Sequence, residues 1–152
     1  MLTALIVAVL SATATAVAAP EAHIVAAPNS PVRLDSAKVI NTDAEPLVLL
    51  YAATNASGAP LEVFTVVVFV FDAQGQLKGR QVAPGRRELG VGETKYSAMV
   101  LDVGKIEATD TLLAGVDQAQ RVGSDEWWRA DLRLLAQQAA DAQRGAATKK
   151  PK

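Results

Sequence analysis

The chain has 152 residues, half of them apolar and about a fifth charged, which is enough for one folded domain with a hydrophobic core. A formal net charge of −1 provides no electrostatic footprint for nucleic acid, so we expect no nucleic-acid partner. The absence of cysteine excludes disulfides, thiolate metal sites and a cysteine nucleophile.

The N-terminal stretch predicts an export signal. An apolar block at residues 2–10 passes into small residues and ends in Ala16-Val17-Ala18, an A-x-A cleavage pattern. No Lys or Arg precedes this block, and the alternative interpretation is an N-terminal membrane anchor that is not cleaved. We expect residues 1–19 to be a signal peptide, with cleavage preferred after Ala18. The mature chain is then periplasmic or secreted and has no membrane contact.

Residues 20–31 contain three prolines and predict an extended leader. Beyond the leader, apolar runs that are bounded by turn residues predict strands at residues 32–40, 47–54, 61–72, 76–82, 95–103 and 111–122. The short turn at residues 55–60 indicates an antiparallel hairpin between the second and third of these strands, and the glycine-rich stretch at residues 84–93 indicates a loop.

About six or seven strands at hairpin spacing, with no helix between them, predict an all-β fold with a C-terminal helix. We expect an immunoglobulin-like antiparallel β-sandwich over residues 32–123. The strands at residues 32–40 and 76–82 are expected at sheet edges, where they could accept a strand from a partner.

The segment at residues 124–144 changes character and predicts a helix that packs on the sheet. Ser124 is a candidate N-cap, and apolar residues from Trp128 to Ala142 recur at helical spacing. The alternative is that residues 126–129 close the last hairpin as a short strand and that the helix begins near Ala130. Residues 145–152 are expected to form a disordered basic tail.

The stretch at residues 61–72 is apolar on both faces, so both faces require cover. One face is expected against the second sheet. The other face, which carries Phe64, Val66 and Val68, would then be covered by the C-terminal helix, by a second copy of the chain or by a ligand. These three residues and the adjacent pair Trp127 and Trp128 form the candidate binding surface, because tryptophans could stack on a sugar or a peptide.

The residues of common catalytic sites are missing. His23 is the only histidine and lies in the leader, so we interpret it as a solvated residue and expect no Ser-His-Asp triad and no histidine metal centre. Asp102, Glu107 and Asp110 flank one connection without the rhythm of a calcium loop, and we expect them to be solvated. We therefore expect no catalytic residue, no metal, no cofactor and no enzymatic activity.

Residues 47–103 contain a series of three turn motifs. They are Tyr51-x-x-Thr54-Asn55-x-Ser57-Gly58-x-Pro60-Leu61, then Val66–Phe71-Asp72-x-x-Gly75, and later Val91-Gly92-Glu93-Thr94. This pattern resembles small exported bacterial immunoglobulin-like domains, including the FxLYD type. Members of such groups are mostly uncharacterised cell-envelope proteins. The resemblance implies the fold and the cellular address, and it assigns no functional residue.

These observations predict an exported, non-catalytic β-sandwich protein of the bacterial cell envelope. Its expected role is to bind another envelope protein, an envelope component or a second copy of itself. Two alternatives remain open: a hydrolase that uses paired carboxylates, and a carrier that holds an apolar ligand between sheet and helix.

Overall fold

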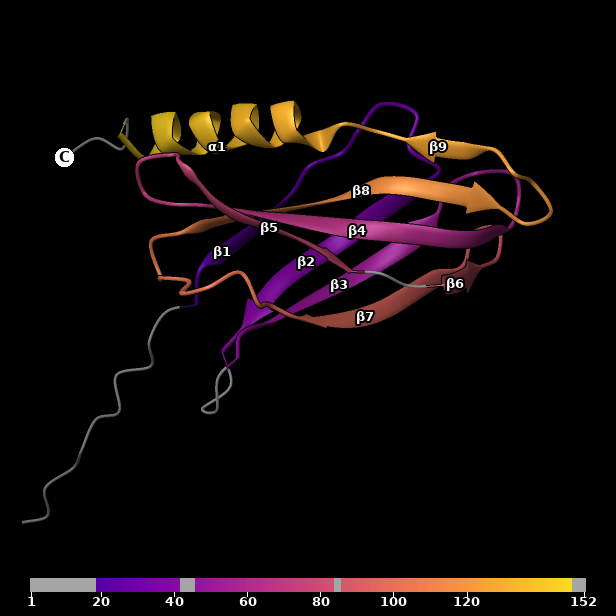
Figure 1. Ribbon diagram of the computed structural model, residues 1–152, viewed down its shortest axis with the longest axis horizontal. Helices are drawn as coiled ribbons and strands as arrows, with labels where there is room; N and C mark the ends of the chain where they lie inside the picture. Colours follow the sequence, from indigo (N-terminus) through magenta and orange to yellow (C-terminus); the bar gives the residue numbers. More distant parts are fainter. Residues whose placement is uncertain (1–18, 42–45, 84–85, 149–152) are drawn as a thin grey trace, which may run out of the picture.

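The computed structural model describes residues 19–41, 46–83 and 86–148, so the predicted signal peptide, except for Ala19, and the last four residues of the tail lie outside it. Within these ranges the chain forms nine strands and one helix (Figure 1): β1 (Glu21–Ile24), β2 (Val32–Ile40), β3 (Val48–Asn55), β4 (Leu61–Phe71), β5 (Leu77–Ala83), β6 (Arg86–Leu89), β7 (Thr94–Val100), β8 (Thr111–Arg121), β9 (Trp127–Arg129) and α1 (Leu132–Thr148). In the part of the chain so described, no helix is long and apolar enough to span a bilayer.

The strands form two sheets that pack face to face, which confirms the expected all-β sandwich with a C-terminal helix. In the large sheet, β4 and β8 are central; β5 and β6 pair with β4, and β1 and β9 pair with β8. The small sheet has the order β2-β3-β7. All strand pairs are antiparallel except β1 with β8. The chain crosses between the sheets repeatedly, as in immunoglobulin-like sandwiches.

Strand β4 is buried on both faces, as its sequence predicts. Every residue from Phe64 to Phe71 is buried. The even-numbered side chains of this stretch lie in the core between the sheets, whereas Val67, Phe69 and Phe71 pack against α1. The helix lies along the outer face of the large sheet, on the side away from the small sheet (Figure 1).

The assignment of the two faces of β4 requires a correction. Phe64, Val66 and Val68 are only 2%, 1% and 0% exposed, because they face the small sheet rather than the helix. They cannot form a binding surface in this fold. Both faces of β4 are equally apolar, so alternation alone does not show which face meets the second sheet.

The predicted hairpin between residues 47–54 and 61–72 is wrong, since β3 and β4 belong to different sheets. Asn55 is buried at this crossing, and its side-chain amide donates hydrogen bonds to the carbonyls of Ala59 and Leu89, both at 2.9 Å. The backbone N–H of Ser57 donates to Asn55 Oδ1 at 2.8 Å. This buried polar group fixes a crossover where turn composition alone suggests a tight hairpin.

Strands also occur in two stretches without a predicted strand. Within the leader, β1 adds to the large sheet in parallel with residues 111–114 of β8, so this part of residues 20–31 is extended and belongs to the fold. In the predicted loop at residues 84–93, β6 pairs with the start of β4 at Leu61 and Val63. Both strands have four residues, which is too short for a clear apolar pattern.

The helix begins later than residue 124. Residues 127–129 pair with Gln118–Gln120 as β9, which confirms the alternative in which a short strand precedes the helix. Asp131 is the N-cap residue, and its Oδ1 accepts a hydrogen bond from the N–H of Arg133 at 3.0 Å. The helix continues through Gly145 to Thr148, so the first residues of the predicted tail are helical.

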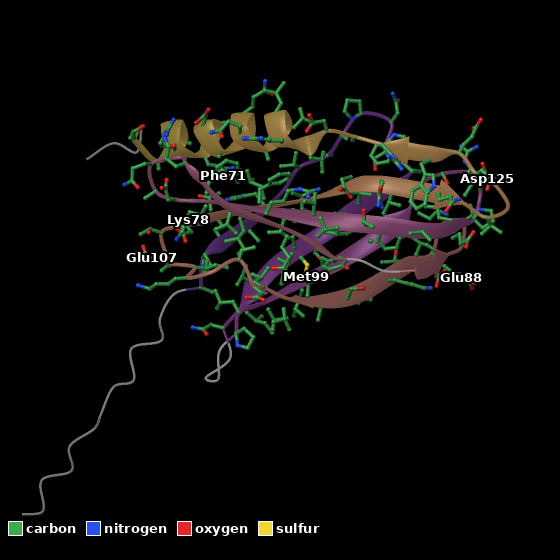
Figure 2. All side chains as sticks on the ribbon, viewed as in Figure 1. Phe71, Lys78, Glu88, Met99, Glu107 and Asp125 are labelled. Atoms are coloured by element: carbon green, nitrogen blue, oxygen red, sulfur yellow. The ribbon has the colours of Figure 1, made fainter. Side chains whose placement is uncertain are left out.

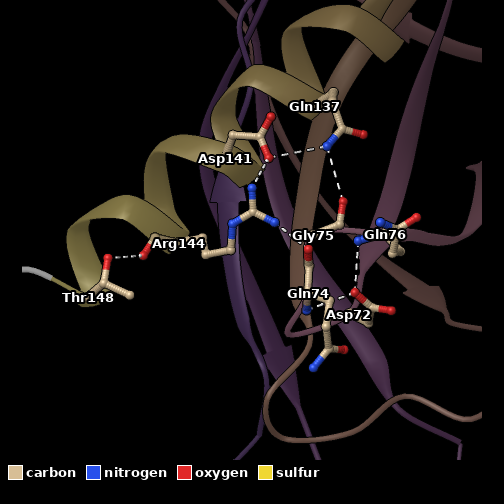
Figure 3. A network of polar contacts seen from close by, with 8 residues as sticks. All are labelled: Asp72, Gln74, Gly75, Gln76, Gln137, Asp141, Arg144 and Thr148. Carbon is tan, nitrogen blue, oxygen red and sulfur yellow. Dashed lines mark hydrogen bonds and ion pairs between the residues drawn. The ribbon is translucent and has the colours of Figure 1, made fainter.

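Polar contacts attach the far half of α1 to the β4–β5 turn (Figure 3). Gln137 Nε2 donates to the carbonyl oxygen of Gly75 at 3.1 Å, and the Arg144 guanidinium donates to that of Gln74. Asp141 holds the same guanidinium at 2.8 Å. The helix is therefore fixed on the sheet by its apolar face and by this turn.

Gly115 of β8 marks the closest approach of helix and sheet. A Cβ atom at this position would lie 2.6 Å from both Leu132 Cδ1 and the carbonyl oxygen of Val25. The backbone oxygen cannot move without disturbing the β1–β8 pairing. Only glycine therefore lets β1, β8 and α1 meet at this point.

We expect Gly115→Ala to lower the free energy of unfolding by about 1–3 kcal/mol, the range for overpacking a well-filled site. Gly58→Ala is the matched control, because a Cβ there meets nothing within 4 Å. Urea unfolding followed by circular dichroism measures both variants. Equal stabilities of the two would contradict the close approach.

Candidate binding cleft

The adjacent tryptophans of β9 have different environments. Trp128 pairs with Ala119 of β8, and its half-buried side chain packs against both the core between the sheets and the core under the helix. Trp127 points the other way and is 37% exposed. Alternation along a strand thus makes Trp128 an anchor and leaves Trp127 at the surface.

A cleft of about 300 Å³ lies beside these tryptophans. Its residues come from the start of β4, from the loop between β1 and β2, and from the β8–β9 hairpin: Asn29, Pro31, Leu61, Ala119, Arg121, Ser124, Glu126, Trp127 and Trp128. We call this cleft the Trp cleft. It includes residues of the β8–β9 turn, whose position Asp125 marks in Figure 2, at the opposite end of the molecule from Lys78. Its volume is at the lower end of the range for small-molecule sites.

The β8–β9 turn that forms one wall of the Trp cleft is held by its own hydrogen bonds. Gln120 Nε2 donates to the carbonyl oxygen of Ser124 at 2.7 Å, and the N–H of Glu126 donates to Ser124 Oγ at 3.1 Å. Gly123 has a φ of 71°, a left-handed conformation that favours glycine. The wall is therefore defined before any ligand arrives.

Three polar side chains of the Trp cleft have no partner among the residues that the structure describes. They are Asn29, Arg121 and Glu126, which form no side-chain hydrogen bond or ion pair there. Asn29 also has a φ of 57° and is the only non-glycine residue in the described ranges with a positive φ. All three residues are exposed, so water solvates these groups in the free protein, and a ligand in the cleft would replace that water.

Arg129 contacts the exposed tryptophan. Its guanidinium carbon lies 5.8 Å from the centroid of the Trp127 ring, within the distance of a cation–π contact. Both residues lie on the same side of β9, since they are two positions apart. Both side chains are exposed, so the contact favours this orientation of the Trp127 ring by only about 0.5–1 kcal/mol.

Of the five candidate residues, the structure brings only Trp127 and Trp128 to the Trp cleft, while Phe64, Val66 and Val68 lie in the core. The sequence analysis missed Asn29, Arg121 and Glu126. Arg121 and Glu126 are near the tryptophans in the sequence but carry no distinguishing pattern, and Asn29 joins them only where the β1–β2 loop meets the β8–β9 turn in the folded chain.

The carboxylates around residues 102–110 are not all solvated, which corrects the expectation for Asp110. Its side chain is 1% exposed, its Oδ2 lies 2.6 Å from Lys78 Nζ, and the same oxygen accepts the N–H of Glu107 at 2.8 Å. Figure 2 shows Lys78 and Glu107 at the same end of the sandwich. The hydrogen bond from Lys78 to Asp110 raises the pKa of the lysine above its usual value.

His23 is part of β1 rather than a solvated leader residue. Its side chain is 23% exposed, and Nε2 lies 3.6 Å from Glu21 Oε2. It is not among the residues that form the Trp cleft. Across the described ranges, no group of three or more His, Cys, Asp or Glu side chains is arranged to hold a metal ion.

A second cavity of about 320 Å³ lies between β5 and the start of α1. Val67, Phe69 and Leu77 contribute apolar surface to it. Its main polar groups already interact, since Arg80 Nη2 lies 3.2 Å from Asp117 Oδ2 and the guanidinium lies over the ring of Phe69 at 6.0 Å. We call this cavity the helix groove.

No family model, no curated protein and no solved structure matches the chain. The resemblance to FxLYD-type domains therefore stays a prediction.

We expect Trp128→Ala to lower the free energy of unfolding by about 2–4 kcal/mol, because the half-buried indole fills space between two cores. Trp127→Ala is the matched variant and should change the free energy of unfolding by less than about 1 kcal/mol, as for an exposed residue. Urea unfolding followed by circular dichroism avoids dependence on tryptophan emission. A larger loss for Trp127→Ala would reverse the two assigned roles.

Proposed function

We propose that the chain is an exported, non-catalytic β-sandwich protein of the bacterial cell envelope, and that it binds another envelope protein or an envelope component through the Trp cleft. The observation that carries this proposal is an exposed tryptophan, in contact with Arg129, beside a cleft in which the side chains of Asn29, Arg121 and Glu126 have no partner among the described residues. Tryptophan and arginine are the residue types that most often dominate binding energy at interfaces.

The apolar-ligand carrier is the second candidate, and the helix groove is the observation that favours it. The binding protein is preferred because the groove's Arg80 and Asp117 already pair with each other, whereas Arg121 and Glu126 of the Trp cleft do not. Along the first half of the helix, Leu132, Ala136 and Ala140 are buried against the sheet and fill the space there. The hydrolase has less support, since Asp110 and Asp117 are each bound to a basic side chain.

Export is tested by the N-terminus of the mature protein. When the full chain is expressed in a Gram-negative host, mass spectrometry of the periplasmic fraction should show a mature chain that starts within about two residues of Ala19, because signal peptidase requires small residues before the cut. Ala18→Phe is the control and should slow processing. Recovery of unprocessed wild-type protein in the membrane fraction would instead support the anchor.

Binding is tested with immobilised protein and envelope extract. We expect the wild type to retain a component that Trp127→Ala loses, because truncating an anchor aromatic typically weakens binding by about tenfold or more. Tyr96→Ala is the matched control: Tyr96 is 83% exposed on the small sheet, away from the cleft. If the wild type and Trp127→Ala retain the same envelope components to the same extent, a binding role of the cleft is contradicted.

A further inference from the structure

We propose that the ligand of the Trp cleft is an uncharged saccharide of the envelope, bound as one or two sugar rings. This inference rests on the proposed binding function and names the ligand class of the same site. It follows from three features of the cleft: the position of Trp127, the kinds of polar group beside it, and its size.

The exposed indole of Trp127 offers a flat apolar surface. A pyranose ring has one face of C–H groups that packs on such a surface, while its hydroxyl groups point outward around the ring edge. Arg129 lies over one face of the indole, so a sugar would stack on the other face. The adjacent Trp128 is held by the core and limits the cleft on its inner side.

The polar groups of the Trp cleft match the pairs of neighbouring hydroxyls on a sugar. Arg121 carries a planar set of donors, Glu126 carries two acceptor oxygens, and the amide of Asn29 supplies both. Each planar group can therefore contact two adjacent hydroxyls at once. A ligand with hydroxyls on several sides satisfies all three groups, which have no partner in the described part of the chain.

The charges in the Trp cleft favour an uncharged ligand. Arg121 and Glu126 contribute one charge of each sign, and Arg129 over Trp127 and Asp125 in the β8–β9 turn add one more of each, so the cleft offers no net attraction for an anion or a cation. An acyl chain would find little apolar cover in the Trp cleft. The aliphatic residues that line the cleft are Pro31, Leu61 and Ala119. A peptide strand would find only the three residues of β9 to extend. A saccharide is the class that uses both the indole and the unpaired polar groups.

The two tryptophans of the chain both line the cleft, so the intrinsic emission of the protein reports directly on this site. The probes are two neutral tetrasaccharides, one of β-1,4-linked glucose and one of β-1,4-linked N-acetylglucosamine. We expect at least one of them to produce a saturable change in tryptophan emission. Isothermal titration calorimetry then measures the affinity of the variants without relying on emission.

Trp127→Ala should weaken saccharide binding by about tenfold or more, as expected for removing a stacking anchor. Glu126→Gln preserves the shape of the side chain but exchanges one acceptor oxygen for a donor, and it should weaken binding several-fold. Tyr96→Ala should bind as the wild type does, which excludes general stickiness of exposed aromatic residues. Circular dichroism confirms that each variant is folded before titration.

Two results would overturn the saccharide assignment: no saturable response to either tetrasaccharide, or equal affinity of Trp127→Ala and the wild type. These results are distinct from failure of the proposed function. If envelope extract still yields a component that Trp127→Ala loses, the Trp cleft is a binding site for another class of ligand. If that retention is absent as well, the proposed function fails together with the saccharide assignment.

Discussion

Strand β4 has apolar side chains on both faces, and the rest of the fold provides cover for each of them. The small sheet covers one face, and α1 covers the other. At roughly 25 cal/mol per Å² of apolar surface, leaving several Val and Phe side chains in water would forgo on the order of 5 kcal/mol. Because whole domains are stable by only about 5–15 kcal/mol, the helix is part of the folding unit and not an appendage.

Because α1 covers the outer face of the large sheet, the path of the chain from β8 to α1 determines where the Trp cleft lies. After β8 the chain must turn back and reach the outer face of the large sheet within a few residues. Strand β9 makes this return: Trp128 enters the core at the junction, and the Ala130 N–H donates to the carbonyl of Asp117 at 2.8 Å. The same alternation that buries Trp128 turns Trp127 outward. The wall of the cleft that β8 and β9 form is therefore anchored to the core through Trp128.

The sequence predicts the long strands well, because β2, β3, β4, β7 and β8 carry extended apolar patterns whose period is independent of their partners. The sequence predicts less well which strands pair with one another in the sheets. The turn at residues 55–60 has the composition of a hairpin, yet Asn55 is buried and directs a crossover. The tryptophans of the site were identifiable by residue type. Arg121 and Glu126 were not, because charged residues in a turn carry no distinguishing pattern, and Asn29 was not, because it reaches the cleft from a loop distant in sequence.

The edges of the sheets also bear on where a partner binds. On β5, Gln81 donates through Nε2 to the carbonyl of Val100 and accepts the N–H of Asp102 at Oε1, both at 2.7 Å, so this edge is tied to the end of β7. On β2, the register shifts between Leu34 and Ser36, which disrupts a regular edge. Both features disfavour strand addition from another protein. A partner that does not extend β5 or β2 can instead bind through side chains, and the Trp cleft provides an exposed aromatic ring together with polar groups that have no partner among the described residues.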